Sequence, residues 1–129
     1  MKQTVSAVIL DNEGRVLLLK RSSSRKAYPN KWNTISGTIE NESPKEAILR
    51  EISEELGSGC SLELLEEGKC YKDIQVEGQW IVYPFLFKYK SGGISLNKEH
   101  SEYNWFRRDE LKKLDLVPAA LKDLETFKL

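Results

Sequence analysis

Short apolar runs separated by turn-forming residues predict extended segments in the first part of the chain. From Thr4 to Leu10 the residues are mostly β-branched or apolar, which is typical of a strand. The next four residues, Asp11-Asn12-Glu13-Gly14, supply turn chemistry with a glycine able to adopt positive φ. The extended pattern then resumes from Arg15 to Lys20. These two segments are therefore predicted to form a hairpin.

A polar segment follows this hairpin. Residues 21–31 contain serines, basic groups and a Tyr-Pro-Asn turn, which predicts an exposed loop. Trp32 to Ile39 is predicted to form short extended segments around Gly37.

The clearest helix in the pattern spans Pro44 to Leu56. Ser43 is suited to cap its N-terminus, Pro44 suits the first helical position, and Glu46 lies where it completes a capping box. Gly57 predicts a left-handed end. The apolar positions of one face, which are expected to pack on the core, are Ile48, Leu49, Ile52 and Leu56.

Two long strands are predicted beyond this helix, from Leu62 to Ile74 and from Gln79 to Tyr89, with Gly78 near their junction. Pro84 lies inside the second strand and predicts either an edge position or a bulge, because proline cannot donate a backbone hydrogen bond.

The C-terminal part is predicted to hold a short strand, Tyr103 to Phe106, and two helices, Asp109 to Leu114 and Val117 to Leu129. Leu121, Leu124 and Phe127 recur at helical spacing in the last helix. Strands and helices interleave, so the predicted class is α/β or α+β, with a mixed sheet between helices. A length of 129 residues fits a single domain covering residues 1–129.

Composition narrows the classes of function. Lys plus Arg and Asp plus Glu both total 20, so no global field favours a nucleic acid polymer or an anionic membrane. Cys60 and Cys70 lie ten positions apart without a neighbouring His, and are read as ordinary thiols. The N-terminus lacks the long apolar region of a signal peptide, and no segment is long enough to span a bilayer, so a cytoplasmic location is expected.

Three carboxylates share one face of the predicted helix. At about 100° per residue, Glu51, Glu54 and Glu55 fall within an arc of about 100°. Like charges at this spacing repel, whereas a divalent cation would reverse the sign of their interaction. Clustered carboxylates suit hard cations such as Mg²⁺ or Mn²⁺, although helix composition alone favours a solvated acidic face.

The order of residues from Glu42 to Gly57 resembles the Nudix box, E-x7-R-E-U-x-E-E-x-G, in which U is aliphatic. Each fixed residue matches, and Ile52 fills the aliphatic position. The chain departs from the family before the box, where Ile35-Ser36-Gly37 stands in place of Pro-Gly-Gly and four residues rather than five precede Glu42. Ser58 replaces an aliphatic residue after the box.

The resemblance implies a magnesium- or manganese-dependent hydrolase that cleaves a diphosphate linkage by attack of water at phosphorus. Arg50 would orient a box glutamate through its planar fork. The general base would be a box glutamate such as Glu54 or a loop residue, for which Glu99 is the choice. The implied metal ligands are Glu51, Glu54, Glu55, Glu42 directly or through water, and the backbone at Gly37.

The substrate is the part that the sequence defines least. The basic residues Lys20, Arg21, Arg25 and Lys26 either meet phosphates or belong to a solvated loop, and Arg21 is the chosen phosphate contact. Trp32 and Tyr83 are the chosen stacking residues among the aromatics Tyr28, Trp32, Trp80, Tyr83 and Phe85. His100 is expected to be exposed rather than to contact phosphate.

The partner is expected to be a small nucleotide-like diphosphate, with nucleoside triphosphates favoured because motifs of ADP-ribose and dinucleotide enzymes are absent. Two alternatives stay open: a non-catalytic nucleotide-binding module, and an isopentenyl diphosphate isomerase that shares the fold.

Overall fold

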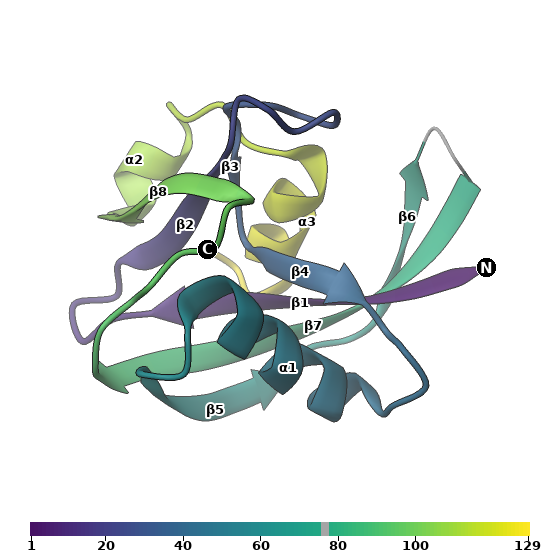
Figure 1. The fold of residues 1–129 in the computed structure, drawn as a ribbon, viewed down its shortest axis with the longest axis horizontal. Coiled ribbons are helices and arrows are strands. Elements are labelled where there is room, and N and C mark those ends of the chain that lie inside the picture. Colours follow the sequence, from purple (N-terminus) through teal and green to yellow (C-terminus); the bar gives the residue numbers. More distant parts are fainter. Residues whose placement is uncertain (76–77) are drawn as a thin grey trace.

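The computed structural model describes residues 1–75 and 78–129. Along the chain the elements are β1 (Lys2–Leu10), β2 (Val16–Arg21), β3 (Trp32–Asn33), β4 (Ile35–Thr38), α1 (Pro44–Leu56), β5 (Ser61–Glu67), β6 (Tyr71–Gln75), β7 (Gly78–Ser91), β8 (His100–Phe106), α2 (Arg108–Leu111) and α3 (Pro118–Thr126) (Figure 1). Within the described residues, the strands form one sheet in the order β3-β2-β1-β7-β5, with β4 paired to β1, β6 to β7 and β8 to β2. The sheet is mixed, as predicted.

Strand β1 is the centre of this sheet. On one side it pairs in parallel with β7 along its whole length, from Lys2 with Trp80 to Leu10 with Lys88. The other side is shared, because β4 pairs antiparallel with residues 4–7 while β2 pairs only where Leu10 meets Val16. The predicted N-terminal hairpin therefore exists, but its two strands separate at once and β4 fills the opening.

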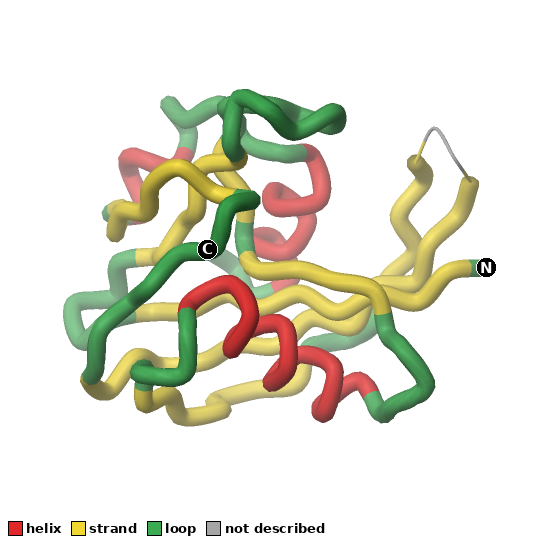
Figure 2. The backbone as a smooth tube through the Cα atoms, in the orientation of Figure 1, coloured by secondary structure: helices red, strands yellow, loops and turns green. Residues whose placement is uncertain are grey.

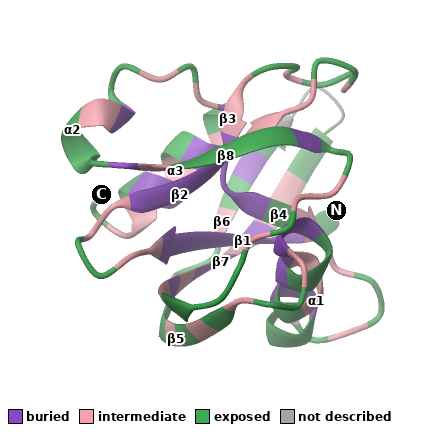
Figure 3. Cartoon of the chain, turned by 60° about the vertical axis from the view of Figure 1, so that its left-hand side comes forward, coloured by how far each residue is buried: buried purple, intermediate pink, exposed green. Residues whose placement is uncertain are grey.

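Helices lie on both sides of the sheet (Figure 2). Val5, Ala7 and Ile9 of β1 pack in the same apolar cluster as the buried residues of α1. Val8 points the other way, into a second cluster that contains Leu124 of α3. Alternate residues of the strand thus bury opposite faces, which explains why its interior, residues 4–9, is buried throughout (Figure 3).

Helix α1 spans the predicted residues, and its start is the predicted capping box. The Glu46 amide donates to the Ser43 hydroxyl at 3.2 Å, and the Ser43 amide donates to the Glu46 carboxylate at 3.1 Å. The predicted left-handed end is wrong in detail, since Gly57 combines φ 80° with ψ 175°. Leu49 was expected in the core but is 51% exposed, because the core face runs through Ala47 instead.

The predicted strand from Leu62 to Ile74 is two strands, β5 and β6, which pair in turn with β7. An edge position for Pro84 is also wrong, because β7 lies inside the sheet between β1 and β5. Proline is tolerated there because its partner strand is interrupted opposite it, where the Gly68 amide donates to the Pro84 carbonyl at 2.8 Å. A side chain at Gly68 would meet the Phe127 ring at 2.9 Å.

The C-terminal elements differ in length from their predictions. Strand β8 is longer than expected, starting at His100, whereas α2 ends at Leu111 and α3 ends at Thr126. Leu121 is 50% exposed and so does not contribute to the apolar face predicted for α3. None of the helices in residues 1–75 and 78–129 is long and apolar enough to cross a bilayer.

Candidate active site

A cavity of about 750 Å³ opens beside the C-terminal half of α1. One end is lined by charged side chains, and the other by the hydroxyl, carboxyl and aromatic groups of Thr4, Ser6, Thr34, Tyr71, Asp73, Trp80 and Asp123. The charged end brings together Arg21, Arg25, Glu51, Glu54, Glu55, Glu99 and His100. Residues from α1 and from two loops distant in sequence therefore face one space.

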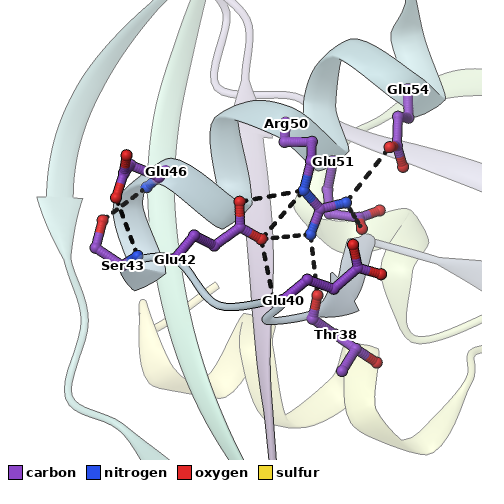
Figure 4. Close-up of polar contacts among 8 residues, drawn as sticks. All are labelled: Thr38, Glu40, Glu42, Ser43, Glu46, Arg50, Glu51 and Glu54. Carbon is purple, nitrogen blue, oxygen red and sulfur yellow. Dashed lines mark hydrogen bonds and ion pairs between the residues drawn. The ribbon is translucent and has the colours of Figure 1, made fainter.

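Arg50 organises the outer part of the acidic helix (Figure 4). Its guanidinium donates to Glu42 through Nη2 at 2.6 Å and Nε at 3.1 Å, and to Glu51 through Nη1 at 2.8 Å. It also donates to the Thr38 carbonyl at 3.0 Å and reaches Glu54 at 3.4 Å. The hydrogen bonds from Arg50 lower the pKa of Glu42, while the same carboxylates raise the pKa of Arg50. Arg50 thus contacts three of the box glutamates, Glu42, Glu51 and Glu54.

Glu51 lies directly over Gly37. A Cβ atom placed at Gly37 would be 2.0 Å from the Glu51 carboxyl carbon, so only glycine leaves room for this carboxylate. Burial raises the pKa of Glu51 against the opposing hydrogen bond from Arg50. The absence of a side chain at Gly37 thus leaves the space that the Glu51 carboxylate occupies.

Glu55 is the most deeply buried of the three helix carboxylates, at 4% exposed. Burial and the negative charges of Glu51 and Glu99 raise its pKa well above the ordinary range. Its Oε2 atom has no hydrogen-bond partner among the described residues, and neither has the buried Nδ1 of His100. This carboxylate is therefore oriented into the site with one oxygen free.

His100 is buried, at 7% exposed, and the expectation of an exposed histidine is wrong. It begins β8 opposite Arg21, and both residues line the cavity. Burial lowers the pKa of His100 to about 4, so its imidazole is neutral at pH 7. Its Nε2 lies 3.6 Å from Glu55 Oε1, which is a contact rather than an ion pair.

Asn97 connects the acidic helix to the loop that carries Glu99. Its amide nitrogen donates to the Glu54 carbonyl at 3.1 Å, and its oxygen accepts from the Glu99 amide at 3.0 Å. The Glu99 carbonyl accepts from the Ser22 amide at 2.9 Å, and Glu99 Oε2 lies 2.7 Å from Arg25 Nη1. Glu99 is thus brought to the same cavity as the helix carboxylates.

The far end of the cavity is organised by Asp123, which is 1% exposed. Its carboxylate accepts from the hydroxyls of Ser6 at 2.8 Å, Thr34 at 2.8 Å and Tyr71 at 2.5 Å. Burial raises the pKa of Asp123, and the three hydroxyl donors oppose that rise. Nothing in the spacing of these residues predicted the network, since only the fold brings residues 6, 34, 71 and 123 together.

The two predicted stacking residues lie outside the cavity lining. Trp32 packs edge-on against Phe106 with ring centroids 4.9 Å apart, and Tyr83 packs on the core beneath α1. Tyr28 and Trp80 line the cavity in their place. Trp80 lies near the start of β7, opposite Lys2 of β1, so its position at the cavity depends on strand register rather than on composition.

The donor set of the acidic face fits a hard divalent cation. Carboxylate oxygens from Glu51, Glu54 and Glu55 share one helical face, and Glu55 keeps a buried oxygen without a partner. Among the described residues no group of three acidic, histidine or cysteine side chains is already gathered as a metal cage. Arg50 instead pairs with Glu42 and Glu51, so binding of a cation would require these side chains to shift.

These features define a class of protein: an α+β enzyme with a carboxylate-bearing helix beside a cavity suited to a phosphorylated ligand. The family model described as NUDIX domain matches residues 1–127. The chain therefore belongs to the Nudix family, and it is a Nudix hydrolase, of the class that acts on phosphoric anhydrides.

Known relatives agree with this assignment. A nucleoside triphosphatase NudI of Klebsiella pneumoniae (strain 342) is 30% identical over 130 residues, covering 92% of each chain. The crystal structure of the MutT protein from Methanosarcina mazei Go1 superposes with a TM-score of 0.83 and 28% identity, over 98% of this chain and 92% of that one. The NUDIX domain of Shewanella oneidensis NrtR, complexed with ADP ribose, has a TM-score of 0.74 at 21% identity, over 98% and 85%, and shares the fold.

Proposed function

We propose that the protein hydrolyses a nucleoside triphosphate, or a closely related nucleotide with a diphosphate linkage, using Mg²⁺ or Mn²⁺ held by Glu51, Glu54 and Glu55. The observation that carries this proposal is the shared cavity: the three helix carboxylates, the candidate base Glu99 and two arginines all line the same 750 Å³ space. The name of the NudI relatives supports a triphosphate. Isopentenyl diphosphate isomerisation has no corresponding thiol, because neither cysteine lines the cavity.

Different residues in and around the cavity would bind the phosphates, the base and the metal-binding carboxylates. Arg21 and Arg25 supply positive charge for the phosphates at the charged end, and Tyr28 and Trp80 offer aromatic surface for a base. Arg50 would keep Glu42 and Glu51 in position through its hydrogen bonds to both carboxylates. Bound Mg²⁺ or Mn²⁺ would polarise the phosphate oxygens and lower the pKa of a bound water.

Proton transfer is assigned to Glu99. As the water oxygen bonds to phosphorus, its proton passes to the Glu99 carboxylate, and the electron pair of the broken P–O bond stays with the leaving phosphate oxygen. Glu99 is 56% exposed in its side chain, so it is accessible to a water in the cavity. Glu54, with a side chain 55% exposed, is the competing assignment within the box.

A substrate panel tests the proposal. Nucleoside triphosphates, nucleotide sugars, ADP-ribose and dinucleotides are supplied with Mg²⁺ or Mn²⁺, and release of phosphate or pyrophosphate is measured. We expect turnover of at least one triphosphate that vanishes in EDTA, and a loss of about a hundredfold or more in Glu54→Gln. Glu66→Gln, which removes the same charge from the exposed face of β5, is the matched control.

Full activity in EDTA would refute the metal assignment. The alternative, a non-catalytic nucleotide-binding module, predicts saturable binding of a nucleotide without turnover of any compound in the panel. The complete set of box glutamates favours catalysis over that alternative.

A further inference from the structure

We propose that Arg25 is a switch residue, which holds Glu99 in the substrate-free enzyme and exchanges it for a substrate phosphate, thereby releasing Glu99 for catalysis. This inference rests on the proposed function for its catalytic consequence, although the exchange itself is a binding event. The starting observation is the ion pair between Arg25 Nη1 and Glu99 Oε2 at 2.7 Å, inside the cavity that the helix carboxylates line.

The charges around the cavity explain why such an exchange is favourable. Among the residues that the structure describes, two cationic side chains line it, Arg21 and Arg25. The carboxylates that do so number seven: Glu40, Glu51, Glu54, Glu55, Asp73, Glu99 and Asp123. A polyphosphate brings further negative charge into this space and requires cationic partners. Arg25 is the more adaptable of the two arginines, because the Nε of Arg21 already donates to the Ala27 carbonyl at 2.8 Å.

The existing pair is easily broken. Arg25 Nη1 is buried and has no hydrogen-bond partner among the described residues, so its 2.7 Å contact with Glu99 Oε2 is an ion pair without a hydrogen bond. The Glu99 side chain is 56% exposed, so water can solvate its carboxylate once the pair separates. Phosphate and carboxylate can each accept two hydrogen bonds from a guanidinium, but a polyphosphate carries more negative charge. The guanidinium therefore changes partner at small cost when a phosphate enters.

The backbone around both residues is held while their side chains are free to separate. The Ser22 amide donates to the Glu99 carbonyl at 2.9 Å, and the Asn97 side chain ties Glu99 to the carbonyl of Glu54. Loss of Arg25 from Glu99 consequently leaves the Glu99 carboxylate beside the acidic helix. The released carboxylate is then available to accept a proton.

Binding of inorganic triphosphate, measured by calorimetry with Ca²⁺ present, tests the exchange without requiring turnover. Arg25→Ala should weaken binding about tenfold, the scale of one charged hydrogen-bonded contact. Glu99→Gln should tighten binding roughly two- to fivefold, because the competing carboxylate is gone. In the Arg25→Ala background, Glu99→Gln should give a clearly smaller gain, since no arginine is left to be freed.

Matched controls separate the exchange from general electrostatics. Lys26→Ala removes a cation from the same loop, and Glu102→Gln removes an acid near Glu99, at exposed positions outside the cavity lining. Both should leave the dissociation constant within about twofold. An equal gain from Glu99→Gln with and without Arg25, or no triphosphate binding by the parent protein, would overturn the proposal.

Turnover adds a second readout. With a substrate from the panel, Arg25→Ala should raise KM by about the factor lost in triphosphate binding and change kcat little, whereas Glu99→Gln should lower kcat. A protein that shows the triphosphate effects but no turnover would retain the exchange and refute the hydrolase proposal. Equal losses of kcat in both variants would instead assign Arg25 to the transition state and contradict the switch.

Discussion

Gly37 and Glu51 approach each other so closely that Gly37→Ala is a direct test of the site geometry. The added Cβ would lie 2.0 Å from Glu51 Cδ and 2.2 Å from Oε1, distances at which the carboxylate must move. The backbone at Gly37 is not in the left-handed region, so alanine itself is tolerated there. The carbonyl of residue 37 is retained, and the perturbation therefore falls on Glu51.

Two opposing effects set the change in stability. Alanine restricts the unfolded chain, which stabilises the fold by about 0.4–1 kcal/mol. Displacing Glu51, whose side chain is 13% exposed, weakens its 2.8 Å hydrogen bond with Arg50, and charged bonds contribute about 1.5–3 kcal/mol when intact. Because Arg50 keeps Glu42, we expect a net loss near the lower end, about 1 kcal/mol.

The change in activity should be much larger than this change in stability. A metal ligand held away from its productive position typically costs about 10- to 100-fold in metal affinity or activity. We expect Gly37→Ala to need a higher Mg²⁺ or Mn²⁺ concentration for half-maximal turnover and to lose turnover on that scale. Denaturant unfolding and metal titration of the rate measure the two quantities separately.

Gly93→Ala is the matched control, because a Cβ there meets no atom within 4 Å. In a Glu51→Ala background, Gly37→Ala should be nearly silent, since the three nearest atoms all belong to the missing side chain. A Gly37→Ala protein with parental metal affinity and turnover would refute the placement of Glu51 as a ligand held by glycine clearance.

Three further predictions use other parts of the site. Glu99→Gln should lower turnover by roughly 10² to 10⁴ with little change in metal affinity, and a nearly silent variant would move the base elsewhere. A glycine inserted after Asn41 should change KM or substrate preference more than metal affinity, because it lengthens the loop before the cap; loss of metal binding in a folded protein would contradict this. In EDTA, Glu55→Gln should stabilise the fold increasingly as the pH rises above about 4.5, the ordinary value for this carboxyl. Because the pKa of Glu55 is higher in the folded than in the unfolded protein, the parent loses stability as the pH rises above the unfolded-state pKa. Denaturation curves without this trend would contradict the burial of an ionisable Glu55.

The sequence predicts best the features that depend on interactions between residues close together in the chain. The capping box and the ends of α1 involve residues within a few positions of Ser43, so their chemistry is visible in the sequence. In the short loop before this cap, Asn41 adopts φ 51°. Asparagine tolerates that conformation better than most residues.

Features that depend on sheet register were predicted poorly. Aromatic residues on a strand are alike in sequence, and only pairing decides that Trp80 lines the cavity while Trp32 packs on Phe106. The edge position predicted for Pro84 is wrong for the same reason, because the interruption that accommodates the proline belongs to the partner strand. The exposed position predicted for His100 is wrong because the histidine pairs with Arg21 at the start of β8 and is buried there.

The box glutamates differ in how far other side chains compensate their negative charges. Arg50 compensates the charges of Glu42, Glu51 and in part Glu54, so most of the repulsion expected on the acidic face is relieved without metal. Glu55 is left out of this network, buried beside a neutral histidine, and its pKa is raised accordingly. A buried carboxylate of this kind destabilises a fold unless another group compensates it. The Ser36 backbone donates a hydrogen bond to Glu55, and Arg50 is engaged with Glu42 and Glu51. Glu55 is therefore the box carboxylate whose negative charge the proposed cation would compensate most.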